Sequence, residues 1–338
     1  MNMRRVCSGL LASLMLLGMI SSAGAEWQEE IKFRKVVRRT WVDETGKTAV
    51  APEGYAFVTL SYSGNTVTEK YYDAAGEPVQ VQGGYYSRAL TYGNKHRLEE
   101  TVYLDRNGDR VDCAEGYARV KVSYMSGGGV TSASYYDHNN NLVMVPALGY
   151  AQVKNDYRGN TLTKTTYLDE NRNPVDVPAG YAVMIQSVNK SNKVTGIRFE
   201  HADGSPAACQ EGWASLTREL DRKNREISVK YYDLSGALTD PGLGYAMQTR
   251  TWESDTVCVI RRFDAQEQQI PMGNGYAALR QETNKKGLVI KETFLGEDGS
   301  PKENAEGIAS RVYDYDGNGQ LTETRYYTAG GTPVSKAP

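Results

Sequence analysis

One short signature, Gly-aromatic-Ala, recurs along this chain of 338 residues at a nearly constant interval. A repeat of this kind constrains the fold more than any other feature, because each unit must bury its surface against its neighbours. Successive copies are separated by 30 to 33 residues. The copies begin at Gly54, Gly84, Gly116, Gly149, Gly180, Gly212, Gly244, Gly275 and Gly307, with Tyr86 replacing the alanine once and Ile308 replacing the aromatic residue once.

Two further landmarks run in phase with this signature. A triplet such as Tyr231-Tyr232-Asp233 recurs once per unit, usually followed by Gly three residues after the Asp and often by Pro two residues later. Asp caps its own backbone, Gly adopts positive φ and Pro interrupts a strand ladder, so this run predicts a turn. Short Gly/Asn sequences such as Ser63-Gly64-Asn65 predict tight hairpin turns. Each unit is therefore predicted to be strand, tight turn, strand, longer turn.

The predicted fold class is all-β, with tandem antiparallel β-hairpin repeats of about 32 residues each. We expect these hairpins to form a long twisted sheet or a β-solenoid, because the edges of each hairpin are satisfied only by its neighbours. In one predicted strand, Val120 and Val122 alternate with Arg119 and Lys121. This alternation indicates an antiparallel sheet with one apolar face and one wetter face.

No linker or shift in composition divides the chain after its first residues. We therefore predict a single array over residues 26–338, with about nine hairpin units. Trp41-Val42-Asp43 is an early copy of the aromatic-x-Asp landmark. Its register predicts that residues 29–42 form one strand ahead of the first complete unit.

Residues 1–25 have the three parts of a secretory signal peptide. Arg4-Arg5 precedes an apolar run, and the small residues Ala23 and Ala25 occupy the two cleavage positions. We expect cleavage before Glu26 and no membrane span afterwards, and a membrane anchor is the alternative. The chain is accordingly predicted to be secreted and extracellular, or held at a cell surface.

The charge balance argues against a nucleic-acid partner, and the cysteine spacing argues against a disulfide. The chain has 39 Lys and Arg against 41 Asp and Glu, so it lacks the basic character of a nucleic-acid-binding protein. Cys113 and Cys209 hold the same slot three repeats apart, and Cys258 lies elsewhere. In an open array Cys113 and Cys209 are too far apart for a disulfide, so we expect three unpaired thiols.

The aromatic residue of the signature is the main candidate for ligand binding. A row of rings at equivalent places along the array could stack on the sugar rings of an extended glycan. The alternative is a ladder between repeats that fills the core, and recurrence in every unit favours this alternative. The row comprises Tyr55, Tyr85, Tyr117, Tyr150, Tyr181, Trp213, Tyr245 and Tyr276.

No catalytic constellation is visible in the sequence. The histidines His96, His138 and His201 occupy different slots of three repeats, and are expected in solvent-facing turns or strands. Nucleophile elbows, phosphate loops and zinc-protease motifs are missing from the sequence. We therefore predict no catalytic residues, no cofactor and no metal ligands.

Some Asp-rich turns resemble parts of calcium loops. Asp314-x-Asp316-x-Asn318-Gly319 has Arg325 at the twelfth position, where a calcium loop needs a bidentate Glu. The runs starting at Asp105 and Asp169 place oxygens at matched slots. Ordinary Asx turns explain these runs with fewer assumptions, and Ca²⁺ binding is the alternative.

The motifs resemble those of a known class of repeats. Tyr231-Tyr232-Asp233-Leu234-Ser235-Gly236 is similar to the tyrosine-aspartate repeats of bacterial surface and toxin-shell proteins of the Rhs type. The aromatic pair with a following Gly-Tyr or Gly-Trp resembles choline-binding and cell-wall-binding repeats more weakly. The resemblance covers nearly all of residues 27–334, although the period is longer than in either class. It implies extracellular, surface-associated repeats.

These observations predict a non-enzymatic secreted or cell-surface repeat protein. Its expected role is binding or scaffolding, with a cell-wall glycan or a surface protein as partner. The alternative is an extracellular carbohydrate-active hydrolase that uses clustered carboxylates, and a pocket with convergent carboxylates would favour it.

Overall fold

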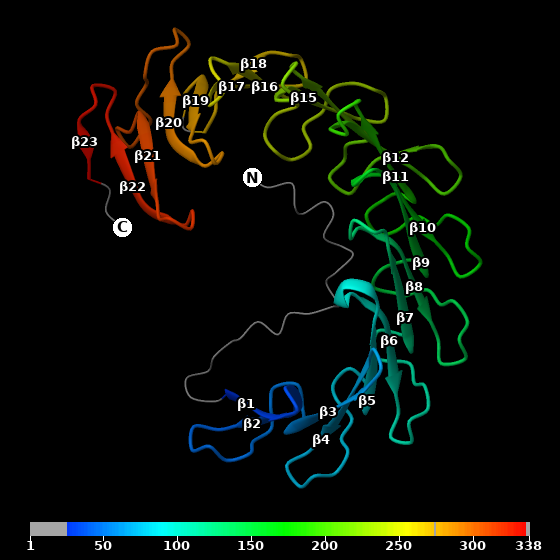
Figure 1. The fold of residues 1–338 in the computed structure, drawn as a ribbon. Coiled ribbons are helices and arrows are strands. Elements are labelled where there is room, and N and C mark those ends of the chain that lie inside the picture. The colour runs from blue at the N-terminus through cyan, green and yellow to red at the C-terminus, as the bar shows by residue number, and fades with distance from the viewer. Residues whose placement is uncertain (1–25, 274, 336–338) are drawn as a thin grey trace. The chain divides into compact units, whose positions relative to one another are not determined.

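The structure is a computed structural model that describes residues 26–273 and 275–335 (Figure 1). The predicted signal peptide, residues 1–25, lies outside the described residues. Contacts divide the chain into two units. One unit runs to Lys121 and includes Asp137–Asn140, and the other comprises Val122–Tyr136 and the residues from Asn141 onward. We describe each unit by itself.

The first unit is built from consecutive antiparallel strands that pair in chain order, from β1–β2 to β6–β7. One 3-10 turn, η3, lies between two of its strands. The elements are β1 (Glu26–Lys32), β2 (Lys35–Val42), β3 (Phe57–Ser63), β4 (Thr66–Tyr72), β5 (Ser87–Tyr92), η3 (Asn94–His96), β6 (Leu98–Leu104) and β7 (Arg119–Tyr124), within which the unit boundary falls.

The second unit continues the same antiparallel pattern from β8 onward. Three two-residue strands, β13, β18 and β23, each pair with the end of the preceding long strand. The elements are β8 (Val130–Tyr136), β9 (Gln152–Arg158), β10 (Thr161–Leu168), β11 (Val183–Val188), β12 (Val194–Glu200), β13 (Pro206–Ala207), β14 (Ser215–Leu220), β15 (Glu226–Tyr232), β16 (Met247–Trp252), β17 (Val257–Phe263), β18 (Gln269–Ile270), β19 (Ala278–Thr283), β20 (Val289–Leu295), β21 (Ser310–Tyr315), β22 (Leu321–Tyr327) and β23 (Pro333–Val334).

This architecture confirms the predicted fold class of tandem antiparallel hairpins in an all-β chain. The predicted tight turns also lie where expected, for example Gly64 and Asn65 between β3 and β4. In β7 the buried Val120 and Val122 alternate with Arg119 and Lys121, as the sequence predicts.

The prediction of one strand over residues 29–42 is wrong. That segment belongs to a hairpin of β1 and β2, which adds a hairpin ahead of the first complete unit. Its turn lies at Phe33 and Arg34, whose φ angles are 51° and 64°. Neither residue is Gly or Asn, so the sequence carries no signal for a turn of positive φ at this place.

The longer turn after most hairpins begins with a five-residue Asx turn. After β2, the amide of Gly46 donates to the carbonyl of Asp43 at 2.9 Å, and the side chain of Asp43 accepts from the amides of Thr45 and Lys47. Asp105 and Asp169 cap their turns through the same two backbone positions. These hydrogen bonds confirm the Asx-turn interpretation of the Asp-rich runs.

A second five-residue turn follows and ends in the Gly-aromatic-Ala signature. In one copy, the amide of Cys113 donates to the carbonyl of Tyr117, and the amide of Gly116 donates back to the carbonyl of Cys113. The residue that starts this turn, eight positions past the Asp landmark, is buried in repeat after repeat. These residues include Ala51, Val81, Cys113, Val145, Val177, Cys209, Met272 and Asn304.

The three cysteines among the described residues, Cys113, Cys209 and Cys258, are buried and carry free thiols. Two of them, Cys113 and Cys209, fill the buried slot of the second turn, where other repeats carry residues such as Ala51, Val81 or Met272. Burial raises the pKa of Cys209 to about 12 and also raises the pKa of Cys113. These thiols therefore act as small apolar groups of the core.

Candidate binding surface

The aromatic residues of the signature lie mainly in the core. Six of the eight are buried, with exposed fractions between 2% for Tyr117 and 9% for Tyr55 and Tyr245, and the other two, Tyr85 and Tyr276, are half-buried. Each ring contacts rings from the first position of the aromatic-x-Asp landmark. In the second unit the ring centroids follow one another at 4.3 to 6.4 Å. We call this stack of rings from both landmarks the ladder.

The geometry of the ladder supports its alternative interpretation as a core between repeats. Tyr181 stacks on Phe199 at 4.3 Å, and Phe199 contacts Trp213 at 4.9 Å. Burial raises the pKa of Tyr231 to about 12 and raises the pKa of Tyr117 further above the usual value for a tyrosine. The rings thus pack against one another by stacked, tilted and edge contacts within the core.

A second row of side chains points to the opposite face of the sheet. Neighbouring residues of a strand point to opposite faces, so the second position of the aromatic-x-Asp landmark faces away from the ladder. We call the aromatic members of this set the outer row, and all of them are half-exposed. They are Tyr72 in the first unit and Tyr136, Tyr232, Phe263 and Tyr327 in the second.

Sequence reasoning missed the outer row, although the signal was present in the doubled aromatics of Tyr231-Tyr232. Adjacent tyrosines in a strand cannot both enter the same core. Their chemistry is identical, so only the register of the strand decides which ring joins the ladder. The slot is aliphatic or charged in the remaining repeats, as Leu104, Leu168, Glu200 and Leu295.

Two members of the outer row, Tyr232 on β15 and Phe263 on β17, flank β16 in the second unit. We call Lys230, Tyr232, Met247, Arg261 and Phe263 the outer patch. Met247 lies opposite both Lys230 and Phe263 in the strand pairing, and therefore bridges the two aromatic strands. The ammonium of Lys230 lies 3.9 Å from Glu267, and the hydroxyl of Tyr232 lies 3.3 Å from that of Thr217. The patch thus combines two half-exposed rings and two half-exposed cations around the buried Met247 on one face of the sheet.

The corresponding place in the first unit is built differently. Tyr72 stacks on Phe57 with ring centroids 4.9 Å apart, and the guanidinium of Arg38 lies 3.6 Å from the centre of the Phe57 ring. Phe57 is buried, so the cation already covers this ring. Met247 holds the equivalent place in the outer patch and is buried like Phe57, while Tyr72, Tyr232 and Phe263 are all half-exposed.

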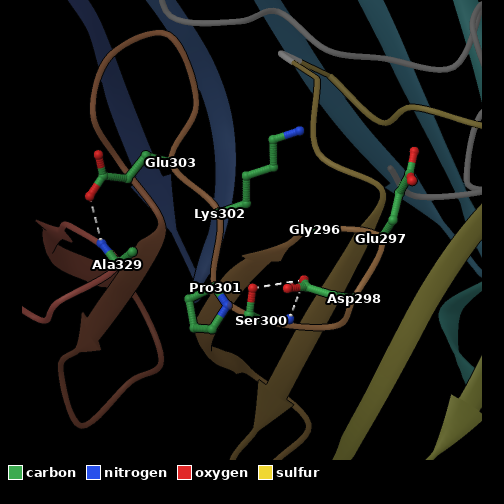
Figure 2. Close-up of a pocket in the computed structure, with 8 residues that line it drawn as sticks. All are labelled: Gly296, Glu297, Asp298, Ser300, Pro301, Lys302, Glu303 and Ala329. Atoms are coloured by element: carbon green, nitrogen blue, oxygen red, sulfur yellow. Dashed lines mark hydrogen bonds between the residues drawn. The ribbon is translucent and has the colours of Figure 1, made fainter.

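A shallow hollow of about 660 Å³ lies beside the turn after β20, and Figure 2 shows its lining. The side chain of Asp298 accepts hydrogen bonds from the amide and hydroxyl of Ser300, which lower its pKa. Glu303 accepts from the amide of Ala329 at 2.9 Å. A general acid for glycoside hydrolysis needs a raised pKa, so Asp298 serves the turn better than it would serve catalysis.

Two histidines are held by aspartates of the preceding repeat. In the first unit, Nδ1 of His138 lies 2.8 Å from Asp112, which also accepts from the His138 amide. In the second, Nδ1 of His201 lies 2.7 Å from Asp176, which accepts from the Ala202 amide. The pairs join successive turns, and both histidines are partly exposed.

The third histidine, His96, is exposed in the turn η3. Within residues 26–273 and 275–335, no group of three or more His, Cys, Asp or Glu side chains is arranged to hold a metal ion. The same part of the chain contains no helix that is long and apolar enough to cross a membrane.

Comparison with known proteins gives little beyond the fold. No family defined by sequence matches the chain, and no curated protein matches it. The TcdB2-TccC3-Cdc42 structure aligns with 87% of this chain and 16% of its own, at 11% identity and a TM-score of 0.23. The Tc holotoxin pore of Photorhabdus luminescens aligns with 88% of this chain and 17% of its own, at 10% identity and a TM-score of 0.24.

A porin-like protein from Bacteroides uniformis aligns with 80% of this chain and 88% of its own, at 8% identity and a TM-score of 0.28. The chain thus spans about a sixth of the length of the toxin chains that it matches. TM-scores this low support no inference about function. The resemblance to Rhs-type repeats therefore rests on the sequence motifs.

Proposed function

We propose that the chain is a non-enzymatic exported repeat protein that binds an extended acidic glycan of a cell surface through the outer patch. The observation that carries the proposal is the placement of Tyr232 and Phe263, both half-exposed, beside Lys230 and Arg261 on one face of the sheet. Ring faces offer flat apolar surface to the CH groups of sugars. The cations form charge-assisted hydrogen bonds with carboxylate or phosphate groups.

An extended ligand suits this surface better than a small molecule. The patch lies on an open sheet face, whereas small-molecule sites bury most of their ligand in a cleft. A polymer that follows the sheet can also contact other members of the outer row, such as Tyr327, and linked weak contacts raise the overall avidity. Export of the protein rests on the predicted signal peptide, which lies outside the described residues.

The test is a binding screen of the exported protein against acidic and neutral cell-surface polysaccharides, followed by titration of the best ligand. We expect the double variant Tyr232→Ala/Phe263→Ala to lower the affinity at least about tenfold, because two stacking contacts are lost. Higher salt should weaken the binding, because Lys230 and Arg261 are solvent-accessible. Tyr62→Ala is the matched control, since Tyr62 is 37% exposed and lies outside the outer row.

Three outcomes would refute the proposal. The double variant could bind as well as the parent chain, or Tyr62→Ala could weaken binding equally. The protein could prefer a surface protein to every glycan. Release of new reducing ends from a bound polysaccharide, with saturable kinetics, would establish the hydrolase alternative instead.

A further inference from the structure

The strands β1 and β22 each present an unpaired edge. Within the described residues, β1 pairs only with β2. β22 pairs with β21 along its length, and with β23 only at Tyr326 and Tyr327. The outward groups of residues 323–325 in β22 and residues 26–28 in β1 therefore have no strand partner there. Exposed backbone donors and acceptors of this kind are a template for pairing with another chain.

Inside the chain, the equivalent strand edges pair with each other at the junctions between hairpins. In the second unit, residues 291–293 at the end of β20 pair with residues 310–312 at the start of β21. In the first unit, residues 38–40 of β2 pair with residues 57–59 of β3. The last strand of one hairpin thus joins the first strand of the next through three residues. By position in their hairpins, residues 323–325 and 26–28 are the equivalents of these two sides.

We propose that the β22 edge of one copy pairs with the β1 edge of a second copy, so that the chain associates head to tail. Short β23 leaves room for this pairing. The equivalent strand β13 occupies the end of β12 at Phe199 and Glu200, while β14 pairs with the same strand at residues 196–198. An internal junction therefore holds a short strand and a neighbouring hairpin at once.

Backbone N–H and C=O groups at the two edges point outward, as pairing between copies requires. The carbonyl of Tyr327 accepts from the amide of Ala309, so the backbone N–H and C=O of Tyr327 point toward β21. These groups alternate in direction along a strand, and Thr324 is three residues away, so its N–H and C=O point outward. The amide of Trp41 donates to the carbonyl of Ala56, just ahead of β3, so its partner in the β1–β2 ladder, Trp27, faces away from β2. The register of the internal junctions places Thr324 directly opposite Trp27 of the second copy.

Charge and ring packing favour the same register. It places Arg325 opposite Glu26 of the second copy, and opposite charges on facing strands attract. Arg325 already contacts Asp314 at 2.7 Å, but its side chain is 45% exposed and can accept a second acidic partner. The junction would also bring Tyr326, a ladder position, beside Trp27, whose ring contacts Trp41 and Tyr55 at 5.1 and 5.6 Å.

The experiment is sedimentation velocity of the exported protein over a wide range of concentration. The mean mass should rise with concentration beyond that of a dimer, because a head-to-tail contact leaves a free edge at each end. Thr324→Pro should weaken the association at least tenfold, since it removes an outward N–H that β21 does not use. Thr324→Val keeps that N–H and should associate like the parent chain.

Charge variants test the register. Arg325→Glu and Glu26→Arg should each weaken association about fivefold, and the double variant should recover most of the loss. Thermal unfolding of each variant verifies that the hairpins remain folded. A monomer at every concentration, an association that stops at a dimer, equal association of the Thr324→Pro and Thr324→Val chains, or no recovery in the double charge variant would each overturn the proposal.

Discussion

The ladder predicts that removing one central ring will damage the fold far more than removing a ring of the outer row. Phe199 is 2% exposed and stacks between Tyr181 and Trp213 at centroid distances of 4.3 and 4.9 Å. Phe199→Ala removes the buried side chain and both ring contacts. Core Phe→Ala changes cost about 3–5 kcal/mol, and an aromatic pair adds about 0.5–1.5 kcal/mol beyond its buried area. We therefore expect a loss of about 4 kcal/mol.

The matched control is Phe263→Ala, because Phe263 is the same residue type in a half-exposed position of the outer row. Its partial burial predicts a loss of about 1–2 kcal/mol. Urea unfolding followed by circular dichroism measures both values. Hydrogen exchange then locates the effect, because in a repeat array the cost of Phe199→Ala should fall on β11, β12 and β14. Equal losses for the two variants, or unchanged exchange in these strands, would refute the ladder as the core.

Three other perturbations give distinct outcomes. Arg262→Phe should stabilise the second unit by about 1 kcal/mol in urea unfolding, because Arg262 occupies a ladder position over Tyr245 and, within the described residues, its buried Nε lacks a hydrogen-bond partner. Gly180→Ala should cost more stability than Gly212→Ala. Both glycines have positive φ, but a Cβ at Gly180 would lie 2.7 Å from a backbone carbonyl oxygen, whereas a Cβ at Gly212 has open space. The hydrogen bond to Asp112 raises the pKa of His138. The stability that this pair contributes is therefore fully present below the pKa of His138 in the unfolded chain, and is lost as pH rises through its pKa in the folded chain. Unfolding at several pH values should show this loss in the parent chain and not in His138→Gln.

The repeat signal made the fold predictable, while the choice between faces depended on register. Gly116 with its positive φ and the Asp caps of the turns are local features, so the sequence reveals them directly. Tyr231 and Tyr232 are chemically identical neighbours, and only the strand pairing decides which enters the ladder. The turn at Phe33 has no residue that favours positive φ. The hydrogen bond between Asp112 and His138 joins residues that are 26 positions apart, so no local sequence pattern predicts it.

The two rows of rings have different consequences for how the chain can vary between its own repeats. A central ladder ring such as Phe199 packs against rings on both sides, so a change there disturbs two contacts. An outer position carries Tyr72, Leu104, Glu200 or Phe263 in different repeats. This range of side chains shows that the hairpin forms without any particular outer residue.

The outer slot therefore accepts a wide range of chemistry, from the buried Leu168 and Leu295 to half-exposed rings and a carboxylate. This freedom explains how two rings and two cations can gather on β15–β17 without a counterpart in every repeat. Binding that depends on the outer patch should consequently be concentrated in one region of the second unit. Uniform binding along all hairpins would instead require an outer ring in each of them, and Leu104 and Glu200 do not provide one.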